Sequence, residues 1–220
     1  MAVFEALTPA ERAGQLRNPE GAVGLAVAEW LNETNRAGNA RIVALLGVGP
    51  GSHVLEIGFG NGRTVPDVIA QAAEVHYTGL DFSPTMVEEA TRFNAALVAA
   101  GCATFHLGSA ERMPFADASF DRVFSTGVAH FWADPVGPLA EVRRVLRPSG
   151  VSLMGCLQPR AAPDFARLEY GVHLHDATAW DTAYRAAGFA GVDIATVEFE
   201  QAGPDGASIR RYGFLLTARG

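Results

Sequence analysis

Short apolar runs alternate with helical patterns through the middle of the chain. Five runs have the length and composition of buried strands, at about residues 53–57, 75–81, 103–107, 120–125 and 151–157. The intervening segments carry apolar residues at helical spacing, at about residues 63–73, 84–100 and 136–146. Such alternation predicts an α/β fold, in which a parallel sheet is covered by helices on both faces.

The N-terminal segment is predicted to be helical over residues 8–47. Thr8-Pro9 followed by Glu11 is a helix start signal. Apolar positions then continue at helical spacing, and a second short helix is predicted over Ala37–Leu46, which Gly47 ends. We expect these helices to cap the carboxyl ends of the strands, where open α/β sheets bind ligands.

The C-terminal segment predicts one more helix and two more strands. The helix lies at about residues 176–187, and the two β-rich runs lie at 192–200 and 210–218. The loop Gly203-Pro204-Asp205-Gly206 separates the two runs, which is typical of an antiparallel pair.

The first strand breaks into glycines at alternate positions, Gly58, Gly60 and Gly62, just after the carboxylate of Glu56. Glycine lacks Cβ, so a ligand can approach the backbone closely, and strand, glycine turn and helix open a nucleotide-binding unit. Arg63 stands where a dinucleotide fingerprint has its third glycine, and no Gly-Lys-Ser/Thr follows, which disfavours NAD and excludes a P-loop. Glu56 would repel a pyrophosphate and attract a positively charged ligand.

Five segments, in order, resemble motifs of the class I S-adenosylmethionine-dependent methyltransferases. They are Val54–Gly62, Tyr77–Met86, Gly108–Phe115, Phe120–Ser125 and Val145–Gly150. The resemblance implies a Rossmann-like three-layer sandwich with a seven-stranded, mostly parallel sheet and a C-terminal antiparallel strand. It implies a single domain over 1–220, with a helical cap over 1–50 and a core over 51–220.

The same resemblance implies S-adenosyl-L-methionine as cofactor and a small molecule as methyl acceptor. It assigns a set of residues to cofactor binding: Glu56, Gly58, Gly60, Gly62, Asp81, Phe82, Ser83, Met86, Ser109, Ala110, Glu111 and Thr126. Asp81 follows Gly62 by about twenty residues, the spacing at which an acid reaches a ribose hydroxyl. Glu56 would hold either the glycine loop or the methionine ammonium.

The residues of this set that would face adenine each have an alternative interpretation. Phe82 would lie against adenine or pack in the core. Ser109 stands where the family often has Asp, and it supplies hydrogen bonds but no charge. The backbone N–H of Ala110 would still reach the ring, and Glu111 is either a partial substitute for the missing acid or a solvated side chain.

His130 is the candidate catalytic residue. It follows the fourth predicted strand, in a loop that faces cofactor and acceptor in the family, and an imidazole can accept a proton near neutral pH. The alternative is a packed or capping histidine. His173 and His175 form a His-x-His pair, for which packing is preferred over a metal site, and no metal is expected.

The proposed cap carries Trp30, Asn32, Asn35 and Asn39, which either end short helices or contact ligands. An apolar or aromatic acceptor is suggested by the aromatic residues at the mouth of the site: Trp30, Phe131, Trp132 and Tyr170. Cys102 and Cys156 are assigned to the core, because neither has charged neighbours that would activate it.

Composition limits the partners. The net charge is −7, which argues against binding along a nucleic-acid backbone. No apolar run has the length of a membrane span, and no basic and apolar signal segment opens the chain, so we expect a cytoplasmic protein. Two alternatives stay open: a nicotinamide-dependent oxidoreductase and a non-catalytic methyltransferase-like binding module. The sequence does not indicate the oligomeric state.

Overall fold

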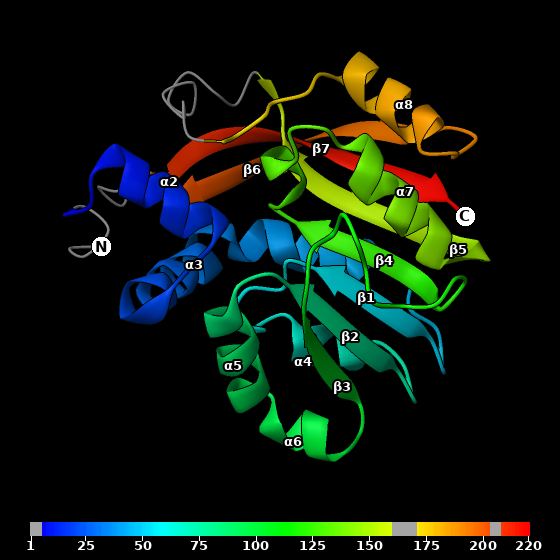
Figure 1. Ribbon diagram of the computed structural model, residues 1–220, viewed down its shortest axis with the longest axis horizontal. Coiled ribbons are helices and arrows are strands. Elements are labelled where there is room, and N and C mark those ends of the chain that lie inside the picture. Colours follow the sequence, from blue (N-terminus) through cyan, green and yellow to red (C-terminus); the bar gives the residue numbers. More distant parts are fainter. Residues whose placement is uncertain (1–5, 160–170, 203–207) are drawn as a thin grey trace.

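The computed structural model describes residues 6–159, 171–202 and 208–220, and in it the strands form one seven-stranded sheet. Their order is β3-β2-β1-β4-β5-β7-β6 (Figure 1). The strands are β1 His53–Ile57, β2 His76–Asp81, β3 Ala103–Leu107, β4 Phe120–Thr126, β5 Leu146–Leu157, β6 Asp193–Ala202 and β7 Ser208–Arg219. β1 to β5 are parallel, and β7 runs antiparallel to both of its neighbours. The predicted Rossmann-like sheet is thus confirmed.

Helices cover both faces of the sheet. They are α2 Pro9–Arg17, α3 Gly21–Leu45, α4 Val65–Ile69, α5 Pro84–Phe93, α6 Ala95–Ala99, the 3₁₀ turn η1 Ala129–Phe131, α7 Val136–Val145 and α8 Ala177–Ala186. Because side chains alternate along a strand, β1 sends Leu55 to the layer of α7 and α8, and Val54 to the layer of α4. Each face therefore buries its own hydrophobic core.

Helix α3 corrects the predicted N-terminal segment. The predicted second helix over Ala37–Leu46 was wrong, because α3 is continuous from Gly21 to Leu45. The break lies earlier, between α2 and α3, where Pro19 disfavours helical dihedrals at Asn18. Gly24 packs against this turn so closely that a Cβ there would lie 2.5 Å from the carbonyl carbon of Pro19.

Two other helices differ from their predicted bounds. The helix predicted over 63–73 is only α4, Val65–Ile69. The helix predicted over 84–100 divides at Asn94, whose side-chain amide donates to the carbonyl oxygens of Gly62 and Ala90, both at 3.0 Å. Asn94 thus ends α5 and fastens it to the glycine turn, a contact between segments distant in sequence.

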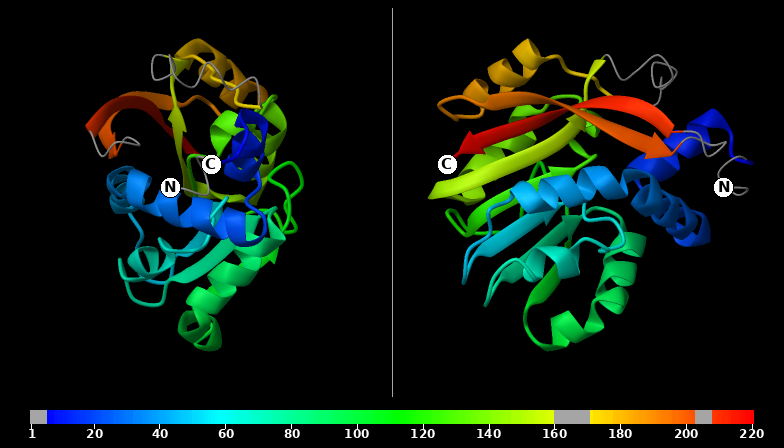
Figure 2. Two further views of the ribbon diagram at one scale, coloured as in Figure 1. Left: turned by 90° about the vertical axis from the view of Figure 1, so that its left-hand side faces the viewer. Right: turned by 180° about the vertical axis from the view of Figure 1, so that it is seen from behind.

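The N-terminal half of α3 lies across the carboxyl ends of the parallel strands, as the left view of Figure 2 shows. Its C-terminal half carries Val43, which packs with Val54 and Phe124 in the core of one sheet face. The cap is therefore continuous with an outer layer, and its division from the core at residue 50 stays a prediction. The loop 203–206 lies outside the described residues. No helix within the described ranges is long and apolar enough to cross a bilayer.

Candidate cofactor and acceptor site

A cavity of about 1530 Å³ opens at the carboxyl ends of β1, β2, β4 and β5, beneath α2 and α3. Single small-ligand pockets are about 300–1,000 Å³, so this cavity has room for two ligands. Its lining includes most residues that the sequence assigned: Gly58, Gly60, Asp81, Phe82, Met86, Ser109, Ala110, Glu111, Thr126 and His130. Glu56, Gly62 and Ser83 are not in the lining, and lie behind it.

The glycine turn needs left-handed backbone, and its glycines serve different purposes. Gly60 has φ +57°, and a Cβ there would meet nothing within 4 Å, because the residue faces the cavity. Gly62 has φ +74°, and a Cβ there would lie 2.8 Å from Cβ of Ala90 in α5. Gly60 therefore keeps the cavity open, whereas Gly62 allows close packing of α5.

Asp81 joins the end of β2 to this turn. One carboxylate oxygen accepts the backbone N–H of Gly60 at 3.1 Å, and the other accepts that of Ser83 at 2.9 Å. A carboxylate has about four acceptor positions, so it can still accept hydrogen bonds from a ligand in the cavity. Burial raises the pKa of Asp81 to about 6.

Glu56 lies beneath the glycine turn, only 1% exposed. Its carboxylate accepts the hydroxyl of Tyr77 at 2.6 Å and that of Thr64 at 3.0 Å. Burial raises the pKa of Glu56 to about 7, although the hydrogen bonds from Tyr77 and Thr64 act to lower it. Thr64 lies at the start of α4 and Tyr77 lies in β2, so Glu56 links β1 to both elements, and each of its two expected roles stays a prediction.

Ser83 ties the same region to the cap. Its hydroxyl accepts the N–H of Met86 at 3.2 Å, capping α5, and donates to the carbonyl of Pro19 at 2.5 Å. The N–H of Gly21 donates to the hydroxyl of Thr85 at 3.1 Å. The α2–α3 turn is thereby fixed to the start of α5, a link that the sequence did not predict.

The loop after β3 carries Ser109, Ala110 and Glu111 along the cavity. The hydroxyl of Ser109 accepts the N–H of Glu111 at 3.2 Å, so it stabilises its own turn. Glu111 is exposed, and Phe82 is 43% exposed beside the cavity rather than buried in the core.

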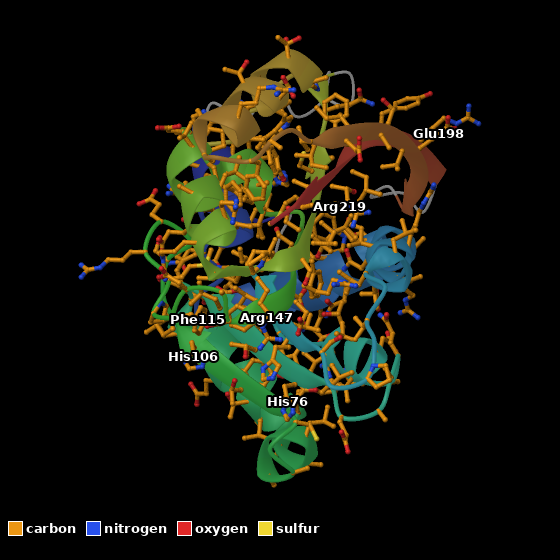
Figure 3. All side chains as sticks on the ribbon, turned by 90° about the vertical axis from the view of Figure 1, so that its right-hand side faces the viewer. His76, His106, Phe115, Arg147, Glu198 and Arg219 are labelled. Carbon is orange, nitrogen blue, oxygen red and sulfur yellow. The ribbon has the colours of Figure 1, made fainter. Side chains whose placement is uncertain are left out.

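Aromatic contacts and α7 hold the far end of this loop. Phe115 meets the ring of His106 edge-on, with centroids 5.2 Å apart, and the two labelled side chains lie side by side in Figure 3. The carboxylate of Glu141 accepts the N–H of Met113 at 2.8 Å, and a guanidinium N–H of Arg144 donates to the Met113 carbonyl at 3.1 Å. These contacts therefore hold this part of the cavity wall against α7.

His130 lies in η1 and is 8% exposed where it meets the cavity. Its Nδ1 is buried and has no hydrogen-bond partner among the described residues. Burial lowers the pKa of His130 to about 4, well below the ordinary histidine value. The imidazole is therefore neutral at pH 7.

His173 and His175 support the loop around His130. The N–H of His173 donates to the His130 carbonyl at 2.7 Å, and the ring of His175 bonds the carbonyl of Trp132 at 3.0 Å. His175 also meets the ring of Trp180 edge-on. Within the described part of the chain, no three or more potential metal ligands come together.

The sequence missed the role of Asn61. This residue lines the cavity and is 2% exposed. Its amide oxygen accepts a hydrogen bond from the side chain of Asn32 at 2.8 Å, and its amide nitrogen donates to Glu29 at 3.2 Å. Asn32 is therefore inside a helix and contacts the glycine turn. The available signal was helical spacing between positions 29 and 32, but no local pattern indicates their partner.

The remaining candidates divide between cavity and surface. Cavity-lining residues include Trp30, Asn35, Asn39, Phe131, Trp132 and Cys156. Cys102 is half-buried rather than in the core, so its assignment was wrong: it lies in the turn before β3. Tyr170 lies outside the described residues.

Known proteins resemble both the sequence and this fold. Residues 55–154 match the family described as "Methyltransferase domain". An O-methyltransferase of Pyrenophora dematioidea is 34% identical over 116 residues, which are 52% of this chain and 43% of that protein. The methyltransferase YdaC of Bacillus subtilis is 28% identical over 163 residues, which are 73% of this chain and 83% of that protein. This chain therefore spans less than half the length of the O-methyltransferase.

The fold has counterparts among solved structures. One chain in the complex between the Haloferax volcanii Trm112 methyltransferase activator and a methyltransferase superposes with a TM-score of 0.73. The match is 20% identical and covers 88% of this chain and 92% of that one, which shows likeness of fold. The family match over β1 to β5, the relatives and the fold together show that this chain is similar to class I S-adenosylmethionine-dependent methyltransferases.

Proposed function

We propose that the protein transfers the methyl group of S-adenosylmethionine to a small-molecule acceptor. The observation that carries this proposal is the meeting of Gly60 and Asp81 at 3.1 Å on the wall of a cavity with room for two ligands. An open glycine backbone beside a carboxylate suits a ligand that carries a ribose.

The residues present fit this cofactor. Asp81 would accept the ribose hydroxyls, Gly60 would let the ligand approach the backbone, and Phe82 would lie against the adenine ring. The cofactor supplies a methyl group already activated by its sulfonium. The protein's task is then to align the acceptor with that group and to exclude water, and both depend on the cap.

The acceptor would occupy the part of the cavity away from Asp81. The apolar residues of the cavity lining include Leu31, Ile42, Phe131, Trp132 and Phe214. Such a lining supports an apolar or aromatic small molecule rather than a charged polymer. The family match ends at residue 154 and leaves out α3 and β7, so the relatives' own acceptors do not transfer to this chain.

Calorimetric binding tests the cofactor. We expect S-adenosylhomocysteine to bind and NAD not to bind, since Arg63 stands where a dinucleotide site needs glycine. Asp81→Ala should weaken binding by about 1.5–3 kcal/mol, the contribution of a hydrogen bond to a charged group. Binding of NAD without S-adenosylhomocysteine would instead support an oxidoreductase.

A second measurement separates an enzyme from a binding module. Incubation with cofactor labelled in the methyl group and a panel of apolar phenols, thiols and amines should transfer label to at least one class. If the protein binds S-adenosylhomocysteine but no acceptor in a broad panel becomes labelled, the result would support the binding-module alternative.

A further inference from the structure

Helix α3 holds the glycine turn through the side chain of Asn61. Both ends of the Asn61 amide are engaged: its oxygen accepts from Asn32 at 2.8 Å, and its nitrogen donates to Glu29 at 3.2 Å. Glu29 and Asn32 are three residues apart, so both lie on the side of α3 that faces the turn. This pair of contacts defines one orientation of the amide.

The turn needs such support because of its composition. Gly58, Gly60 and Gly62 all have positive φ, and glycine loses more conformational freedom on ordering than any other residue. Asp81 holds the N–H of Gly60 from one side. Asn61, between Gly60 and Gly62, holds the turn from α3.

The contacts of Glu29 reach beyond the glycine turn to α5. Its carboxylate forms an ion pair with Arg63, and the guanidinium of Arg63 lies over the ring of Phe93 at 3.8 Å from the centroid. Phe93 is the last residue of α5. The carboxylate of Glu29 therefore connects α3, the turn and α5 on one side of the cavity.

We propose that Glu29 and Asn32 are positioning residues for the cofactor, which act by fixing the amide of Asn61 and with it the binding conformation of the glycine turn. This role rests on the proposed function, because it requires that the turn bind S-adenosylmethionine. A turn held ready before binding loses less conformational entropy when the ligand arrives, so affinity depends on two side chains of the cap.

A reversal of hydrogen-bond polarity tests the role. Asn32→Asp replaces the donor with a carboxylate, so carboxylates face both ends of the Asn61 amide and its oxygen meets an acceptor whichever way the amide is turned. We expect the Kd for S-adenosylhomocysteine to rise about tenfold, the effect of one lost hydrogen bond with an unsatisfied partner. Adding Glu29→Gln supplies a donor on the other side, so the amide can turn over, and the Kd should recover to within about threefold of wild type.

The controls separate positioning from general damage. Glu33→Gln removes the same charge from an exposed position one turn further along α3, and should leave the Kd within about twofold. The melting temperature without ligand is measured for every variant. Asn32→Ala, which adds no charge, provides a second loss of the donor if Asn32→Asp does not fold, with an expected rise in Kd of about threefold to tenfold.

The outcomes are distinct. Wild-type affinity in the folded Asn32 variants overturns the positioning role, and so does a double variant that binds more weakly than Asn32→Asp. Recovery in the double variant supports the role, because a purely structural lesion would not be repaired by a second polar change. If the wild-type protein itself does not bind S-adenosylhomocysteine, the proposed function fails first, and the role fails with it.

Discussion

At the scale of single residues, burial changes the acid–base character of the side chains around the cavity. His130 loses its usual ionisation because no described group compensates the burial of its charge. Glu56 and Asp81 shift in the opposite direction, because the same burial disfavours their carboxylates. Each shift yields a measurable dependence on pH.

For His130, we expect no ionisation near pH 6.5 in the rate of methyl transfer. The imidazole is already neutral above about pH 4, so a role as proton acceptor would fail only as the pH falls toward 4. The check is kcat from pH 5 to 8 at saturating cofactor and acceptor, in wild type and His130→Asn. An inflection near 6.5 that only the wild type shows would contradict the buried, neutral state.

His130 also predicts a stability effect with a definite sign. Its folded pKa of about 4 lies below the unfolded value of 6.5, so the unfolded state binds more protons in that window. The wild type should therefore lose stability relative to His130→Asn as the pH falls from 6.5 to 4. Urea unfolding at several pH values measures the difference, and parallel curves would exclude the shift.

Glu56→Gln should remove a pH dependence of the opposite sign. The folded pKa of about 7 lies above the ordinary value of 4.5, so the stability contribution is full below 4.5 and is lost as the pH rises through 7. The wild type should lose up to about 3 kcal/mol over this range relative to the variant.

At the scale of elements, the glycine turn joins β1 to three other parts of the fold. Asp81 holds it from β2, Asn94 holds it from the end of α5, and Asn32 holds it from α3. The turn is thus a point where several elements meet, and its glycines are under different constraints.

Alanine substitutions should separate these constraints. Gly62→Ala places a Cβ against Ala90 and Asn94, so it should lower stability by more than the roughly 1–2 kcal/mol of left-handed strain alone. Gly60→Ala meets open space and should cost only that strain, but its methyl group would occupy the cavity and weaken S-adenosylhomocysteine binding. Urea unfolding and calorimetry on both variants make the test. Equal effects of the two variants on stability would contradict the assignment.

At the scale of the whole molecule, the sheet, the cap and α5 all contribute to one cavity, so a bound cofactor should stabilise the entire fold. A ligand that binds only the native state at 100 times its Kd adds about 2.7 kcal/mol. For a chain of this size, the melting temperature should rise by roughly 5–10 °C. Thermal unfolding with S-adenosylhomocysteine, and with NAD as the control, measures this. No shift at saturating ligand would contradict the proposed cofactor.

Local pattern was enough for the order and type of most elements. Alternating apolar strands and helical segments encode the parallel sheet, because side-chain periodicity follows backbone geometry directly. The glycine turn and Asp81 could also be recognised in the sequence, since their spacing belongs to one βαβ unit. The helix boundary at Asn94 could not, because it depends on a contact with Gly62, outside its own segment. The boundary at Asn18 follows from Pro19, a local signal that the predicted helix over residues 8–47 did not take into account.

Long-range contacts set the rest of the site. The neutral state of His130 comes from burial, and burial is a property of the packed molecule rather than of neighbours in sequence. The hydrogen bond between Asn32 and Asn61 joins residues 29 positions apart, and no periodic pattern in the sequence predicts it. Backbone preferences act over a few residues, whereas dielectric environment and hydrogen-bond partners arise only when distant segments pack together.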